Sequence, residues 1–129
     1  TVMATLGYIG EKLDLLVRQG ATLGPFTVTL TNPDTTPVNL TGATLRAHLR
    51  KKALDTVKVA DLDVTITDAA AGKFEFGMTD EATAAIPAGE TLKDAASVYV
   101  WDMELEDASG RVLPLYYGDC KVFREVTRV

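Results

Sequence analysis

The chain has 129 residues, a net charge of −5 and a hydrophobic content of 47%. A chain of this length is most simply one domain, and it buries about two-thirds of its extended surface on folding, which is enough for a core without disulfides. The acidic balance argues against broad binding to nucleic acid or anionic membranes, because such binding depends on Lys and Arg. No stretch reaches the roughly 18 consecutive apolar residues of a membrane helix, and no signal-peptide pattern opens the chain, so we expect a soluble protein.

The first residues form no clear hydrophobic period, so we expect an N-terminal arm over residues 1–12 and a folded domain over residues 13–129. We interpret Met3 as the natural start, which makes Thr1 and Val2 additions to the native chain. Two alternatives stay open for the arm: a neighbouring subunit orders it, or it packs on the chain's own sheet. Its three large apolar residues are candidate interface residues: Leu6, Tyr8 and Ile9.

Two glycines in "VRQGATLGPFTVTL" raise the first functional question. A phosphate-binding loop would need the second glycine, Gly24, to open onto a helix. Instead, the apolar residues of 26–30 alternate with threonines, which is the two-residue period of a half-buried strand. Gly20 and Gly24 therefore predict a tight turn or a β-bulge after a strand near residues 13–18.

The same strand period recurs along the rest of the chain, with turn residues between the segments. Strands are expected over residues 45–50, 61–67, 74–78, 99–106, 112–117 and 120–126. Only "TDEATAAIPAG" has a helical pattern, with Thr79 as its N-cap and Pro87 and Gly89 at its end. About seven to nine short strands with one short helical connection predict an all-β, antiparallel β-sandwich, for which "immunoglobulin-like" describes the architecture only.

The candidate catalytic groups are few, and each has a simpler structural interpretation. His48, the only histidine, stands between two arginines on the polar side of its strand, so we interpret it as a solvated residue. Cys120 is the only cysteine, and its alternating context favours a small core residue over a nucleophile. We therefore assign no catalytic, metal-binding or cofactor-binding residue and expect no enzyme activity.

Two charged segments are candidate interface surfaces. The basic stretch consists of Arg46, Arg50, Lys51 and Lys52, and the acidic row consists of Asp102, Glu104 and Glu106. A nucleic-acid patch is disfavoured for the first because it lacks aromatic neighbours, and glycoside hydrolysis or calcium binding is disfavoured for the second because alternate strand positions lie too far apart. If the two strands pair in one sheet, their charges form exposed cross-strand contacts. If they lie on different faces, they form complementary patches for head-to-tail assembly, which is the arrangement we favour.

The aromatic residues offer an alternative function, because Trp101, Tyr116 and Tyr117 are the only plausible platform for stacking on sugars. The alternation of Trp101 with Met103 and Leu105 places its ring on the apolar face instead. The two adjacent tyrosines must point to opposite faces, so one of them is expected to be exposed.

A resemblance extends over Asp14 to Arg128, nearly the whole chain. The matching segments are "DLLVRQGATLGPFTVTL", "PVNLTGATLRAHLRKK", "VTITDAAAGKFEFGMTDEATAAIPAG" and "YVWDMELEDASGRVLPLYYGDCKVFREVTR". They resemble a recurrent small domain of tailed-bacteriophage and prophage virion proteins, with its "Q-G-(A/D)-(T/D)-(F/L)" opening, its "(V/D)-L-T-G" turn, its "L-P-A-G" segment, its "Y-x-x-D-(I/L/M)-E" strand and its closing "G-x-x-x-V-x-x-(D/E)-V-T". One departure is at Asp34 and Thr35, where relatives often place glycine.

The resemblance implies an immunoglobulin-like structural module of a phage tail or baseplate. Its implied partners are other virion proteins and copies of itself, and its implied location is the virion, after synthesis in the bacterial cytoplasm. Three alternatives remain: a capsid decoration protein, a carbohydrate-binding module for host glycans, and a hydrolase that uses Asp102 and Glu104. Nucleic acid and membranes are not expected as partners.

Overall fold

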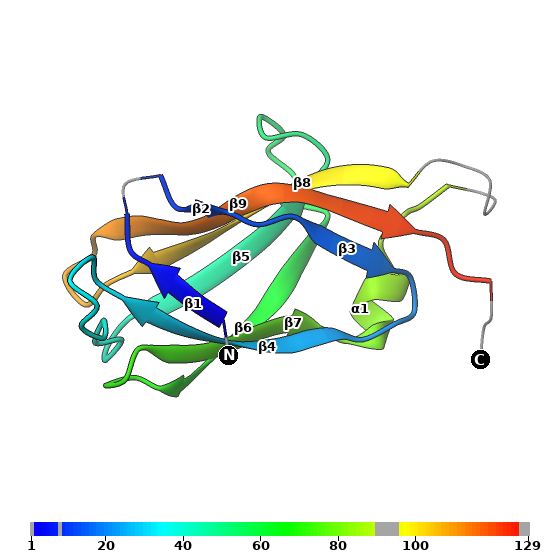
Figure 1. Ribbon diagram of the computed structural model, residues 1–129. Coiled ribbons are helices and arrows are strands. Elements are labelled where there is room, and N and C mark those ends of the chain that lie inside the picture. The colour runs from blue at the N-terminus through cyan, green and yellow to red at the C-terminus, as the bar shows by residue number, and fades with distance from the viewer. Residues whose placement is uncertain (1, 8, 90–95, 127–129) are drawn as a thin grey trace.

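The computed structural model describes residues 2–7, 9–89 and 96–126, and these residues form nine strands and one short helix (Figure 1). The prediction of an all-β chain with one short helical connection is confirmed. Among the described residues there is no helix with the length and apolar character needed to cross a bilayer. The elements are β1 (Val2–Thr5), β2 (Glu11–Lys12), β3 (Leu15–Arg18), β4 (Leu23–Thr31), β5 (Thr44–Arg50), β6 (Ala60–Asp68), β7 (Lys73–Met78), α1 (Asp80–Ala84), β8 (Ser97–Glu106) and β9 (Val112–Phe123).

The strands follow one hydrogen-bonded order, β1-β4-β7-β6-β5-β8-β9-β2, with β3 also paired to β9. Strand β6 connects the two halves of this order, because its first residues pair with β5 and its later residues pair with β7. The sheet therefore bends along β6 and curls nearly into a barrel, with β4 and β7 on one side and β8 and β9 on the other (Figure 1).

The N-terminal segment contributes to both ends of this strand order. Strand β1 pairs with β4, and β2 and β3 pair with β9, all in the parallel direction. The expectation of a purely antiparallel sheet is therefore wrong for these three strands. Of the two alternatives for the arm, this pairing favours packing on the chain's own sheet, because residues 2–5 pair with β4.

The glycine pair lies at a strand entry and not at the start of a helix. Gly20 and Gly24 both have positive φ, and the register between β4 and β7 shifts between Leu23 and Phe26. The predicted turn and bulge are thus confirmed. The only helix of the described residues, α1, begins where the sequence predicts, because the Thr79 hydroxyl accepts a hydrogen bond from Ala82 N at 3.1 Å.

Strand β9 is longer than expected, because the sequence predicts two strands that end and begin beside Gly118. The missing side chain at Gly118 allows the backbone of Leu13 to lie directly against β9, and Asp14 accepts a hydrogen bond from Asp119 N at 2.9 Å. The glycine therefore admits a neighbouring segment and does not end the strand.

The core lies between the two halves of the curled sheet and is filled by the inward-facing residues of each strand. Trp101 is 3% exposed, and its ring forms a three-ring cluster with Phe76 and Tyr116, at a centroid distance of 6.0 Å from each. Cys120 is also buried, as predicted. The alternating residues of β8 therefore have the predicted apolar and polar faces.

Candidate interaction surfaces

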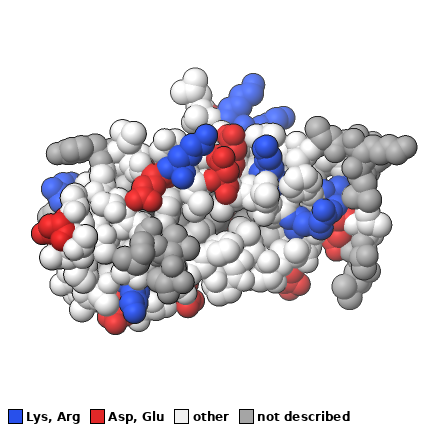
Figure 2. All heavy atoms as spheres, in the orientation of Figure 1, with Lys and Arg blue, Asp and Glu red and all other residues white. Residues whose placement is uncertain are grey.

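The outer face of β5, β8 and β9 carries a row of polar side chains that runs across five strands. The register aligns Lys12 of β2 with Tyr117, Tyr117 with Asp102, Asp102 with His48, and His48 with Asp61 of β6. This face carries charges of both signs, and we call it the charged face; blue and red side chains lie interspersed over the upper part of the molecule (Figure 2).

The acidic row and the strand part of the basic stretch are direct neighbours on the charged face. Strands β5 and β8 pair in register, with Arg46 opposite Glu104. The Arg46 guanidinium lies 3.3 Å from a Glu104 carboxylate oxygen and 3.7 Å from one of Glu106. The arrangement that we favoured from the sequence, with the two charged segments on different faces, is therefore wrong. The alternation of apolar and polar residues shows which face of a strand is exposed to solvent, but it does not show which strand lies next to it.

A hollow of about 420 Å³ lies on the charged face where β8 and β9 meet the start of the β5–β6 connection. Its charged and aromatic lining residues include Lys12, Arg50, Asp102, Tyr117 and Asp119. Burial raises the pKa of the Asp102 carboxyl, and the nearby Glu104 adds to this, while His48 and Arg50 oppose it. The hollow thus presents both charge signs, and it can hold a polar group by hydrogen bonds.

His48 takes part in the polar contacts of this face, so the prediction that it is simply solvated is incomplete. Its Nε2 lies 3.5 Å from the Asp61 carboxylate, and its Nδ1 lies 3.3 Å from the Arg50 guanidinium. Within the described part of the chain, no group of three or more His, Cys, Asp or Glu side chains is arranged to hold a metal ion.

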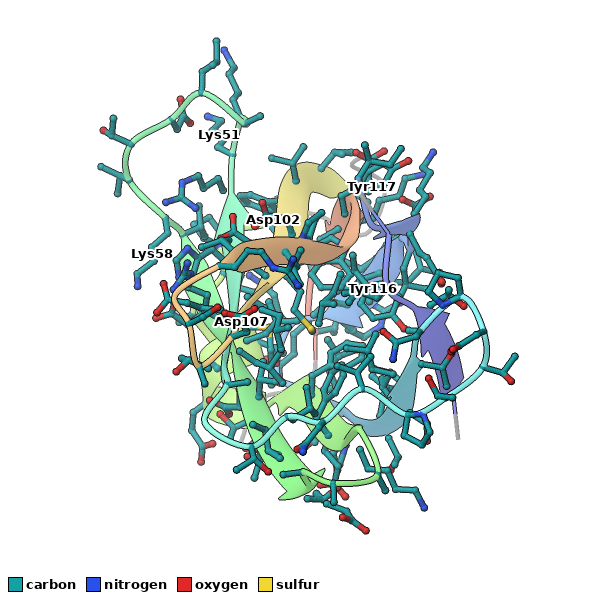
Figure 3. The ribbon with its side chains drawn as sticks, turned by 90° about the vertical axis from the view of Figure 1, so that its left-hand side faces the viewer. Lys51, Lys58, Asp102, Asp107, Tyr116 and Tyr117 are labelled. Atoms are coloured by element: carbon teal, nitrogen blue, oxygen red, sulfur yellow. The ribbon has the colours of Figure 1, made fainter. Side chains whose placement is uncertain are left out.

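The β5–β6 connection, residues 51–59, stands off the body of the protein, with Lys51 and Lys58 on its two arms (Figures 1 and 3). The Arg50 guanidinium donates to Asp55 O at 3.0 Å, and Val59 N donates to Leu49 O at 2.6 Å. These bonds fix the base of the loop. We call this segment the projecting loop.

Two apolar side chains of the projecting loop are exposed over most of their surface, Leu54 at 96% and Val57 at 75%, while Val59 at its base is 37% exposed. Sequence reasoning assigned Lys51 and Lys52 to an interface but missed these two residues. The available signal was their position in "KKALDTVKV", a segment without strand alternation between two clear strands. An ordered loop that displays aliphatic side chains among lysines is a candidate contact surface.

The candidate residues of the N-terminal arm do not share one environment. Leu6 is half-buried and packs against the core, and its N–H donates to Thr31 O at 2.9 Å. Ile9 is 75% exposed. Tyr8 and Thr1 lie outside the described residues. The arm therefore contributes Leu6 to the chain's own core and leaves Ile9 available for contacts.

The three aromatic residues of the sugar-platform hypothesis are not together on the surface. Trp101 and Tyr116 lie in the core, while Tyr117 is 40% exposed on the charged face (Figure 3). The prediction that the two tyrosines point to opposite faces is confirmed. A platform of three exposed rings is therefore not present.

Comparisons with known proteins do not assign this chain to a family. No family model matches the chain, and a search of the curated proteins returns no match.

Proposed function

We propose that this chain is a non-enzymatic structural protein of a tailed-bacteriophage particle, in the tail or baseplate. It acts through contacts with copies of itself and with other virion proteins, and it resides in the virion after synthesis in the host cytoplasm. The observation that carries this proposal is the projecting loop, which holds Leu54 and Val57 in solvent on an anchored base. Aliphatic side chains fixed in this way bury their surface only when another macromolecule covers them.

We also propose that the fold is an immunoglobulin-like sandwich. The strand order supports this, because β1-β4-β7-β6 form one consecutive set and β5-β8-β9 with β2 and β3 form another. The buried Trp101 on a central strand is consistent with a core between two such layers. A module of this kind presents loops and outer faces for contacts while its core stays unchanged.

Two measurements on the purified chain test the proposed function. Sedimentation velocity at increasing protein concentration should reveal oligomers, and a glycan array should give no specific binding. A chain that stays monomeric and binds a defined glycan would contradict the proposal in favour of a carbohydrate-binding module. A Tyr117→Ala variant would then show whether the exposed ring on the charged face contributes to the glycan site.

A further inference from the structure

A second hollow lies on the outer face of β4, β6 and β7, and we call it the Gly77 hollow. In the register of the sheet, Gly77 stands opposite Asp63, and Leu23 stands opposite Met78. Gly77 adds no side chain to this face, and the bulge of β4 forms the adjoining wall. The hollow has a volume of about 180 Å³.

The lining of the Gly77 hollow combines apolar walls with an acidic rim. Leu23, Pro25 and Met78 supply apolar atoms, and Asp63 and Glu75 supply carboxylates. The hollow is open to solvent, and threonines complete its lining. It has room for one branched aliphatic side chain against its apolar wall, and its acidic rim favours a cation beside that side chain.

The projecting loop has the complementary chemistry. Leu54 is exposed over nearly its whole side chain, and the loop carries three lysines against one aspartate. The whole chain has a net charge of −5, so the rest of the molecule is more acidic than the chain as a whole. An aliphatic side chain among lysines thus matches an apolar hollow with an acidic rim.

The projecting loop stands on the side of the molecule opposite β4 and β7 (Figure 1), and of its lysines Lys58 already pairs with Asp61 of β6 at 2.9 Å. We propose that Leu54 of one copy inserts into the Gly77 hollow of the next copy, with Lys51 and Lys52 facing Asp63 and Glu75. This contact rests on the proposed function and specifies its partner as a second copy of the chain. It joins two different surfaces, so it is heterologous and builds a ring or a filament.

Disulfide trapping between two different single-cysteine variants tests the contact directly. A Leu54→Cys chain is mixed with an isotopically labelled Thr65→Cys chain, since Thr65 is exposed and also lines the hollow. Cys120 stays in place because it is buried. The control mixture combines Leu54→Cys with Val112→Cys, another exposed position. Mixed disulfides are quantified by mass spectrometry in a glutathione buffer.

The contact predicts that the Leu54–Thr65 mixed disulfide forms at least about tenfold faster than the control disulfide, because docking raises the local concentration of the two thiols. The difference should shrink at high salt. Equal rates in the two mixtures would overturn the proposal. Control-level trapping together with Leu54-dependent binding to anionic vesicles would overturn it in favour of a lipid surface.

Charge reversal gives an independent readout of the same contact by sedimentation. One variant carries Lys51→Glu and Lys52→Glu, and the other carries Asp63→Lys and Glu75→Lys. Each variant alone should lose self-association, whereas their mixture should regain it, because each loop then meets a hollow of opposite charge. A matched control, Lys121→Glu with Arg124→Glu, which changes two cationic residues outside the loop and both hollows, should associate like the wild type.

Unchanged self-association in both reversal variants, or no gain on mixing, would overturn this contact. Oligomers of the wild type that form without Leu54–Thr65 trapping would leave the structural function intact and assign it to another surface. A wild type that is monomeric at every concentration, with control-level trapping, would contradict both the contact and the proposed self-assembly.

Discussion

The indole Nε1 of Trp101 donates a hydrogen bond to the carbonyl oxygen of Leu13 at a distance of 2.7 Å. This bond joins the centre of β8 to the segment between β2 and β3, which lies along β9. Because the Trp101 ring also stacks on Phe76 and Tyr116, one side chain connects the N-terminal segment with both halves of the sheet.

Truncation of Trp101 should therefore destabilise the whole fold. Trp101→Ala is expected to lower the free energy of unfolding by about 3 to 5 kcal/mol, the range for removing a large buried ring. Trp101→Phe keeps most of the ring but leaves the Leu13 carbonyl without its donor, so it should cost about 1 to 3 kcal/mol. Urea unfolding followed by circular dichroism measures both. Red-shifted tryptophan emission in the wild type, readily quenched by acrylamide, would contradict the buried position.

Strand β1 should contribute to stability, contrary to the expectation of an arm that only a neighbouring subunit orders. Ala4 is buried and Leu6 is half-buried against the core, so deletion of residues 1–6 should lower the free energy of unfolding by about 2 kcal/mol. Thermal and urea unfolding of the deleted chain give the answer. Ile9→Ser is the matched control, because it changes an exposed residue of the same segment. An unchanged midpoint after the deletion would support the original expectation.

The sequence predicts the strands of this protein better than their partners. The alternation around Trp101 and around Val28 identified the strands and their buried faces, since a two-residue period follows directly from strand geometry. Nothing in that period reports that Arg46 lies opposite Glu104, because pairing depends on how distant segments meet. The lack of strand alternation in residues 51–59 indicated a loop at Leu54, but it could not show that the side chain is exposed, since an apolar residue in an irregular segment is compatible with burial. The interaction surfaces, which depend on pairing and loop position, therefore had to come from the structure.

Thr35 is the non-glycine residue with positive φ among the described residues, and its φ is 70°. A β-branched residue is strained in this left-handed region, whereas glycine adopts it freely. Thr35→Gly should raise the free energy of unfolding by about 0.5 to 1 kcal/mol after the greater flexibility of the unfolded chain is subtracted.

Thr36→Gly is the matched control for this turn. The Thr36 hydroxyl donates to the Asp34 carboxylate at 2.6 Å, so its loss should destabilise the same turn. Thermal melts of the two variants should shift in opposite directions. A fall in stability on Thr35→Gly would show that the threonine is not strained.

Tyr116 should make the fold sensitive to alkaline pH. Burial raises the pKa of its hydroxyl from 10.0 to about 12, and burial also raises the pKa of the Cys120 thiol from 9.0 to about 11. Both groups hold their protons more tightly in the folded state than in the unfolded state. Their contribution to the free energy of unfolding is therefore complete below about pH 9 and is lost as the pH rises to about 12. Urea midpoints measured across this interval should decline.

Replacement of Tyr116 by Phe separates its part of this effect. The Tyr116 hydroxyl is buried without a hydrogen-bond partner among the described residues. Tyr116→Phe should therefore stabilise the protein at pH 7 by about 1 kcal/mol and make the alkaline decline shallower. The control is Tyr117→Phe, at the exposed neighbouring tyrosine, which should change neither the stability at pH 7 nor the decline at alkaline pH. A less stable Tyr116→Phe protein would show that the hydroxyl has a partner.

The claim that this chain is a structural component of a phage particle is tested most directly in the particles themselves. Tailed particles are induced from a lysogen that carries the coding sequence, separated on a density gradient and analysed by quantitative mass spectrometry. We expect peptides of this chain to co-sediment with intact tails, in a ratio to the other tail proteins that stays constant across the particle peak, as closed assemblies require. Peptides confined to the soluble fractions, with none in the particle peak, would contradict it.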